Sequence, residues 1–209
     1  MLDDNLRKEL EEKNTWQKPW FGPPLVSHWN HHSDSVDLYI FSNLEEIEVA
    51  LNEKKMGPFK TSDFPGGVVS MRIAFEEGKL EAFASSGIEN ATHKLVTSGR
   101  PAKIQVEKIE YPEAEDYDGV LQFIISIQDE DGVLCPVNDI RIHADYDQSL
   151  VFLGADNGDM SDHQLFTEYT REVRNGKCLF VFKRKEKGKA YDLKFHAEGL
   201  EAADVSSAL

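Results

Sequence analysis

Cysteine is scarce in this sequence: of 209 residues only Cys135 and Cys178 are cysteines, and both are flanked by strand-like residues. Two distant cysteines exclude a disulfide framework and the C-x-x-C spacing of a structural zinc site. Long apolar runs are also missing, because stretches such as Phe123–Ile127 fall far short of the roughly 20 residues of a membrane-spanning helix. We therefore expect no transmembrane segment, and we expect both cysteines to be small residues of a hydrophobic core.

Basic side chains are also in short supply. The 23 lysines and arginines face 38 aspartates and glutamates, which gives a formal net charge of −15. The basic residues are scattered along the sequence instead of forming a stripe, so nucleic acid and anionic membrane surfaces are not expected as partners. Apolar residues at 40% and charged residues at 29% are typical of a folded globular protein with a solvated acidic surface.

Signature motifs of catalysis are absent: the sequence has no G-x-S-x-G elbow, phosphate-binding loop, G-x-G-x-x-G or H-E-x-x-H. Neither a cofactor nor a metal is expected. His28, His31 and His32 could offer nitrogen ligands to zinc or copper, but no cysteine or carboxylate follows at ligand spacing, which favours a turn into the first strand. The loop at 156–162 is rich in oxygen ligands, yet Gly158 comes third, where an EF-hand has glycine sixth. We interpret that loop as a turn held by side-chain to backbone hydrogen bonds.

Apolar and polar residues alternate from about residue 35 onward, which predicts β-strands. The first two alternating segments have turn residues between them, so they are predicted to form a hairpin-type unit. Short strands separated by turns, without helices between them, favour antiparallel sandwiches. The alternating segments are 36–41, 46–51, 69–75 and 80–84 in the first half, and 121–127, 140–142, 150–153, 179–182 and 191–195 in the second.

The fold class is therefore predicted to be all-β, with two consecutive immunoglobulin-like antiparallel β-sandwiches behind a short N-terminal helical or linker segment. Leucines at positions 2, 6 and 10 predict a short helix over 3–13. Turn formers and a proline at 97–101 predict the join between the sandwiches. The expected domains are accordingly 1–20, 21–99 and 100–209.

Tryptophan gathers near the start of the chain, at Trp16, Trp20 and Trp29. An aromatic ring can stack on the apolar C–H face of a sugar, so these three residues and Tyr117 are candidate carbohydrate-binding residues. The alternative is packing between the first sandwich and whatever precedes it. Prolines at 19, 23 and 24 favour that alternative, because they are typical of a connecting segment.

Short sequence segments occur in a distinctive order along the chain. The first half contains HWN at His28–Asn30, VDLYIFSNLEEIEVALNEKKMG at Val36–Gly57 and TSGRPAKI at Thr97–Ile104. This order resembles the first C-terminal module of the glycoside hydrolase family 2 β-galactosidases, where HWNW is followed by a strand ending in SN and by VELFLNGKSLG. In the second half, QDEDGVLCP, GADNGD at Gly154–Asp159 and NGK at Asn175–Lys177 resemble the last domain of that family.

The resemblance implies a part of an enzyme that does not contain the catalytic domain. Family 2 enzymes are retaining glycosidases whose two catalytic glutamates lie on a (β/α)8 barrel, which takes about 250 residues. No such stretch is present, so no catalytic residue is carried over. The expected function is a non-catalytic accessory region of a β-galactosidase-like parent, which supports the barrel, subunit contacts or the substrate entrance. The sequence departs from the family pattern at His31, where the family has an aromatic residue, and at Glu53, where it has glycine.

The partners that the resemblance implies are the catalytic barrel of the parent, a β-galactoside or plant glycan, and further copies of the parent in a homo-oligomer. It also implies a bacterial protein of the cytoplasm, the periplasm or the extracellular space, depending on the parent. The first residues lack the layout of a secretory signal. Two alternatives remain open: an autonomous carbohydrate-binding module that uses exposed aromatics, and a small free-standing enzyme whose residues converge only in three dimensions.

Overall fold

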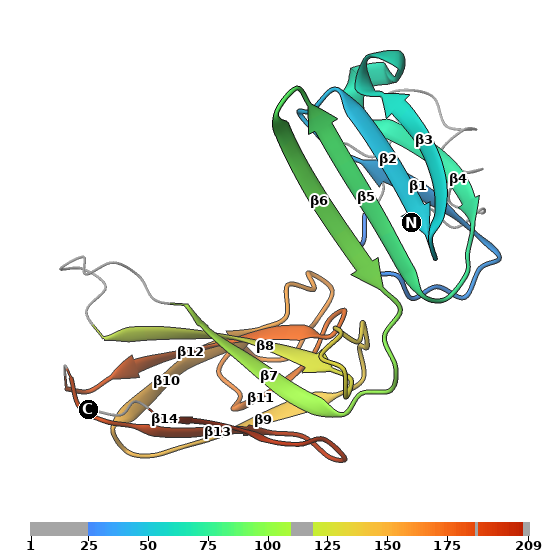
Figure 1. Ribbon diagram of the computed structural model, residues 1–209. Helices are drawn as coiled ribbons and strands as arrows, with labels where there is room; N and C mark the ends of the chain where they lie inside the picture. The colour runs from blue at the N-terminus through green and yellow to red at the C-terminus, as the bar shows by residue number, and fades with distance from the viewer. Residues whose placement is uncertain (1–24, 110–118, 187, 207–209) are drawn as a thin grey trace. The chain divides into compact units, whose positions relative to one another are not determined.

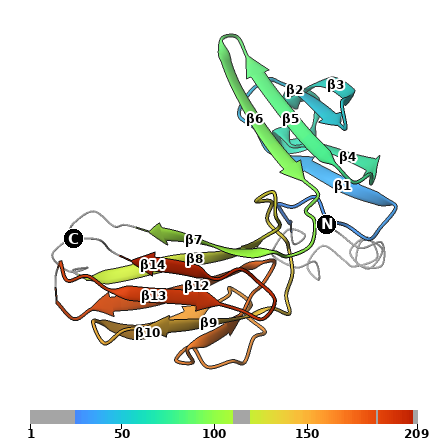
Figure 2. The same ribbon diagram turned by 60° about the horizontal axis from the view of Figure 1, so that its bottom comes forward.

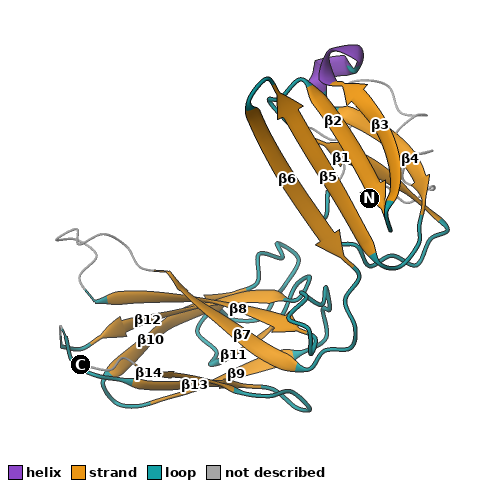
Figure 3. Cartoon of the chain, viewed as in Figure 1, coloured by secondary structure: helices purple, strands orange, loops and turns teal. Residues whose placement is uncertain are grey.

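The computed structural model of the chain describes residues 25–109, 119–186 and 188–206, which form two compact units (Figure 1). Unit 1 comprises Met1–Thr97 and unit 2 comprises Ser98–Leu209. Strands make up nearly all of the regular structure (Figure 3), which confirms the all-β fold class. The helix predicted over 3–13 lies outside the described residues.

Unit 1 is a sandwich of two antiparallel sheets. Its strands are β1 (Ser35–Ile40), β2 (Glu46–Leu51), β3 (Lys54–Lys60), β4 (Val69–Ala74), β5 (Lys79–Ser86) and β6 (Glu89–Val96). The two-stranded sheet has the order β1-β4, and the four-stranded sheet has the order β3-β2-β5-β6. Two short 3-10 turns, Thr61–Asp63 and Pro65–Gly67, follow β3 and are drawn in purple in Figure 3.

The hairpin predicted for segments 36–41 and 46–51 is wrong. β1 pairs with β4, whereas β2 pairs with β3 and β5, so the two segments belong to different sheets. The chain crosses from one sheet to the other at 41–45, where Leu44 is 5% exposed and is part of the core. Both strands do alternate, but the apolar residues of β1 and of β2 belong to the inner faces of two different sheets and not to one face of a single sheet.

Unit 2 is a second antiparallel sandwich. Its strands are β7 (Lys103–Ile109), β8 (Val120–Gln128), β9 (Arg141–Tyr146), β10 (Leu150–Asp156), β11 (Thr170–Glu172), β12 (Lys177–Arg184), β13 (Asp192–His196) and β14 (Ala203–Ser206). One four-stranded sheet has the order β10-β12-β8-β7 and the other has the order β11-β9-β13-β14. Figure 2 shows β7 to β10 and β12 to β14 from a second side.

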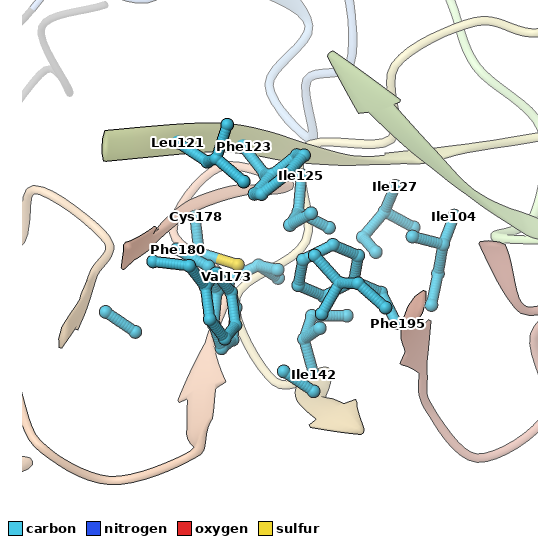
Figure 4. Close-up of a cluster of buried hydrophobic side chains, with 14 of the residues drawn as sticks. Ile104, Leu121, Phe123, Ile125, Ile127, Ile142, Val173, Cys178, Phe180 and Phe195 are labelled. Carbon is cyan, nitrogen blue, oxygen red and sulfur yellow. The ribbon is translucent and has the colours of Figure 1, made fainter. Parts of the chain in front are cut away.

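The core of unit 2 forms where the inner faces of its sheets meet (Figure 4). Every second residue of β8 is buried, and these side chains lie beside buried residues of β12 in the same sheet and face buried residues of β9 and β13 in the other. Phe123, Phe180 and Phe195 are fully buried and meet through tilted and edge-on ring contacts, with centroids 5.2 Å apart for Phe180 and Phe195 and 5.9 Å apart for Phe123 and Phe195. The period of two read from the sequence thus places the correct face of β8 inside.

Both cysteines are core residues, as predicted. Cys135 is 1% exposed and Cys178 is 4% exposed, and neither forms a disulfide. Burial raises the pKa of the Cys178 thiol to about 12, so this side chain behaves as a small apolar residue at neutral pH. Among the residues that the structure describes, no helix has the length and apolar character required to cross a membrane.

Candidate functional site

A hollow of about 400 Å³ opens in unit 1 between β1 on one side and β5 and β6 on the other. Its walls are mainly aliphatic and include Leu38 and Ile40 of β1, Leu80 of β5 and Leu95 of β6. The hollow exists because a two-stranded sheet cannot cover a four-stranded one: the first six residues of β6 are all exposed. A concave apolar space of this size is in the range of small-ligand pockets.

The rim of the hollow is formed by the segment that leads into β1. Leu25 is 51% exposed and Val26 is 37% exposed, and both line the hollow. At the other end of β1, Phe41 also lines the hollow and is 64% exposed. The rim therefore presents three large apolar side chains that nothing in the described part of unit 1 covers fully.

Two neighbouring histidines, His28 and His31, line the hollow. The rings of His28 and His31 lie 5.1 Å apart, and His31 meets the edges of Trp29 and Phe75 at 5.4 and 5.5 Å. Burial lowers the pKa of His31 to about 4, with the charge of His28 as the next cause, and burial also lowers the pKa of His28. With pKa values below the ordinary 6.5, both rings are mainly neutral at pH 7, so they add polar groups but little positive charge to the lining.

The structure places Trp29 in the core, although the sequence made it a candidate sugar-stacking residue. Trp29 is 1% exposed, and its indole nitrogen donates a 2.9 Å hydrogen bond to the carbonyl of Glu76. A buried ring offers no open face on which a sugar could stack. The other three candidates, Trp16, Trp20 and Tyr117, lie outside the described residues, so their binding role stays a prediction.

The loop at 156–162 is a turn, as interpreted from the sequence. Carboxylate and amide oxygens in the loop accept hydrogen bonds from its own backbone: Asp156 from Gly158, Asp159 from Ser161, and Asn157 from Asp159. These side chains are thus used to hold the backbone. Within the described ranges, no group of three or more His, Cys, Asp or Glu side chains is arranged to hold a metal ion.

Sequence reasoning missed an apolar surface on unit 2, which we call the β10 patch. It combines two residues of β10 with three of the following loop. Tyr169 packs against Phe152 at 5.2 Å, and Val151, Leu153 and Tyr169 line one shallow depression. The exposed fractions are 40% for Val151, 47% for Leu153, 65% for Leu165, 62% for Phe166 and 57% for Tyr169. A sequence signal existed: in a strand with one wet face, Val151 and Leu153 should be polar.

One buried arginine holds the loop of the β10 patch in place. Arg171, on β11, donates hydrogen bonds to the carbonyls of Gln164 and Leu165 and forms a 3.1 Å ion pair with Asp162. The loop also joins the edge of β10, where the backbone N–H of Ala155 donates to the Phe166 carbonyl at 2.8 Å. The patch is therefore a fixed surface, positioned by bonds that are largely shielded from water.

Comparison with known proteins gives both units relatives. Residues 104–206 match the model of glycoside hydrolase family 2 C-terminal domain 5, and residues 33–90 match a domain of unknown function, DUF4982. The chain is 29% identical to the β-galactosidase BoGH2A of Bacteroides ovatus over 182 residues. These aligned residues make up 86% of this chain and 21% of that protein. The chain thus spans about a fifth of the length of this curated relative.

Solved structures share the fold. A β-glycosidase from Bacteroides vulgatus is 21% identical with a TM-score of 0.77, over 88% of this chain and 24% of that one. A glycosyl hydrolase family 2 member from Bacteroides cellulosilyticus is 18% identical with a TM-score of 0.82, over 93% of this chain and 26% of that one. At these identities the likeness concerns the arrangement of the strands.

Proposed function

The chain is a C-terminal region of glycoside hydrolase family 2, and from this premise we propose that it is a non-catalytic accessory region of a β-galactosidase-like retaining glycoside hydrolase. Its matches extend over most of this chain but over about a fifth of the curated β-galactosidase, so the greater part of that relative has no counterpart here. The proposed role is to pack against the catalytic barrel of the parent, against another subunit or beside the substrate entrance.

The observation that carries this proposal is the β10 patch. Unit 2 has a hydrophobic core between two four-stranded sheets, yet the five large apolar side chains of the patch remain exposed on its outside. Large contiguous apolar patches are rare on monomeric soluble proteins, and contact with another protein surface is one of the roles that they mark. Contacts between domains of one chain typically bury about 600–1,500 Å², which a patch of this composition could anchor.

The first test is catalytic. We expect purified residues 1–209 to release no p-nitrophenol from p-nitrophenyl β-galactoside above the buffer rate, while the complete gene product hydrolyses it. The reasoning is that the family's two catalytic glutamates lie on the barrel, as the resemblance implies. Hydrolysis that co-purifies with residues 1–209 through successive columns would overturn the non-catalytic part of the proposal.

The second test concerns docking and uses the complete gene product. Leu153→Glu places a charge in the proposed contact, where a buried leucine is worth about 2 kcal/mol. Ile88→Glu is the matched control, because Ile88 is 99% exposed and lies in unit 1, outside the patch. We expect Leu153→Glu to lower the unfolding midpoint of the complete protein and Ile88→Glu to leave it unchanged; equal midpoints for both variants would contradict docking through the patch.

The alternative function is a carbohydrate-binding module, and it makes a different prediction. If Trp16, Trp20 or Tyr117 stacks on sugar, titration of the chain with galactose or a galactan should give saturable heats that an alanine at that position abolishes. The accessory role predicts flat heats at millimolar sugar. The burial of Trp29 removes one of the four aromatic residues on which this alternative depends.

A further inference from the structure

The two sheets of unit 2 have outer faces of opposite character. Because side chains alternate along a strand, the buried residues of each strand mark its inward positions, and the residues between them point outward. On β9 and β13, the central strands of one sheet, every outward position carries a polar or charged side chain: Arg141, His143, Asp145, Asp192, Lys194 and His196. This composition is typical of the solvated side of an antiparallel sheet.

The outer face of the β10-β12-β8-β7 sheet has an apolar centre instead. Cys178 and Phe180 of β12 are buried in the core (Figure 4), so Leu179 between them points outward. Val181 of β12 and Ile124 of β8 point outward for the same reason, and all three side chains are half-buried. If this face were solvated like the other, the outward positions of its two central strands should be polar.

Ile124, Leu179 and Val181 form one continuous surface, which we call the β12 face. Leu179 lies directly opposite Ile124 where β12 pairs with β8, and the Cβ atoms of such a pair are about 4.5–5.5 Å apart. Val181 is two residues from Leu179 on the same side of β12. Its partner on β10 is Gly154, which has no side chain to cover it. Val151 of the β10 patch is the diagonal neighbour of Val181, so the face and the patch adjoin.

Charged side chains border the β12 face on all sides. Asp156 of β10 and Glu107 of β7 are exposed, and they lie at the two ends of the cross-strand row that contains Leu179. Along β12, the next outward residues are the exposed Lys177 and Lys183. An apolar centre with a polar rim is the usual anatomy of a surface that binds another protein surface.

We propose that another domain of the parent polypeptide, with an apolar surface of its own, packs on the β12 face and leaves the outer face of β9 and β13 in water. This inference rests on the proposed function and adds which side of unit 2 is covered. The aligned residues make up only 21% of the curated relative, so a parent of that kind has other domains to supply the partner. A second copy is a poorer partner, because two chains with a formal net charge of −15 repel each other.

Cysteine accessibility tests the proposal, because the chain has only two native cysteines and both are buried. Leu179→Cys reports on the β12 face, and Lys194→Cys, on a central strand of the other sheet, is the matched control. We expect maleimide to modify both thiols readily in purified residues 1–209. In the complete gene product Leu179→Cys should react roughly ten-fold or more slowly, since modification then requires the contact to open, while Lys194→Cys keeps its rate. Mass spectrometry of the labelled peptides gives both rates.

Three outcomes would overturn the proposal. The first is an equal rate for Leu179→Cys in the two proteins, and the second is equal slowing at positions 179 and 194. The third is slowing that grows with protein concentration, which would mean that a second copy covers the face. Val181→Cys predicts the same protection and replaces Leu179→Cys if that variant does not fold.

Leu153→Cys separates this proposal from docking through the β10 patch, because Leu153 is 47% exposed and belongs to the patch. A protected thiol at 153 beside a freely reacting thiol at 179 would refute packing on the β12 face and leave the proposed function standing. Free reaction at both positions in the complete gene product would contradict both.

Discussion

Removal of the Arg171 guanidinium should destabilise unit 2 more than any surface ion pair can. The side chain is 0% exposed. Its Nη1 donates to Asp162 at 3.1 Å and to the Gln164 carbonyl at 3.3 Å, and its Nη2 donates to the Leu165 carbonyl at 2.8 Å. Arg171→Met keeps most of the aliphatic volume but leaves these three acceptors without their donor.

The size of the effect follows from the burial of each acceptor. A buried acceptor that loses its donor costs about 1–3 kcal/mol, and Asp162, whose side chain is 21% exposed, recovers part of its loss from water. The Nε of Arg171 is buried without a hydrogen-bond partner among the described residues, which lowers the stability of the wild type. Methionine removes this unpaired group and so regains part of the loss. The net loss is about 3 kcal/mol, which corresponds to roughly a 10 °C lower midpoint for a domain of this size.

Thermal unfolding followed by near-ultraviolet circular dichroism measures this loss, with unit 1 as an internal reference. Arg141→Met is the matched control, because Arg141 forms a 2.6 Å ion pair with Glu172 in which the two side chains are 53% and 46% exposed. An exposed pair contributes about 0–1 kcal/mol, so this variant should unfold close to the wild type. If the two arginine variants lose the same stability, or if Arg171→Met loses less than 1 kcal/mol, the account of the loop is refuted.

Three further predictions concern single positions. Gly176→Ala should lower the stability of unit 2 by about 2 kcal/mol more than Gly158→Ala does. Both glycines have positive φ, but only at Gly176 would the new Cβ collide with the Cys135 carbonyl. Urea titration of both variants measures the difference. Trp29→Ala should cost unit 1 about 3–5 kcal/mol in the same titration and leave the unit 2 transition in place; two unchanged transitions would contradict the burial. The pKa of His31 is about 4 in the folded chain and ordinarily 6.5, so the unfolded chain binds more protons between these pH values. Unit 1 should therefore lose stability as pH falls from 6.5 to 4, by on the order of 1–2 kcal/mol after allowance for solvent screening. His31→Phe should flatten this dependence of unit 1 stability on pH.

The strands that could be predicted from the sequence are those with one buried face. β8 alternates cleanly because each of its inward residues is buried against the other sheet. β6 escaped detection because its first six residues are exposed on both sides, so no period of two develops, and β3 because Gly57 and Pro58 interrupt it. Alternation indicates which face of a strand is buried but not which strand lies beside it, which is why the β1 and β2 hairpin was wrong.

The candidate surfaces required the three-dimensional arrangement. The hollow depends on the unequal widths of two sheets, and no local pattern encodes how many strands each sheet has. The β10 patch combines Leu153 with Phe166, which the strand edge and the buried Arg171 bring together from separate segments. In contrast, the turn at 156–162 was readable from sequence, because side-chain to backbone bonds form within a few residues.

Hydroxyl-radical footprinting of Phe166 and Tyr169 tests the central claim, docking of the β10 patch in a larger enzyme, most directly. The method labels side chains in proportion to their exposure, and these two rings are 62% and 57% exposed in the chain. The account predicts strong labelling of both rings in purified residues 1–209 and clear protection in the complete gene product, while the exposed Ile88 is labelled equally in both. Equal labelling of Phe166 and Tyr169 in the two proteins would contradict it.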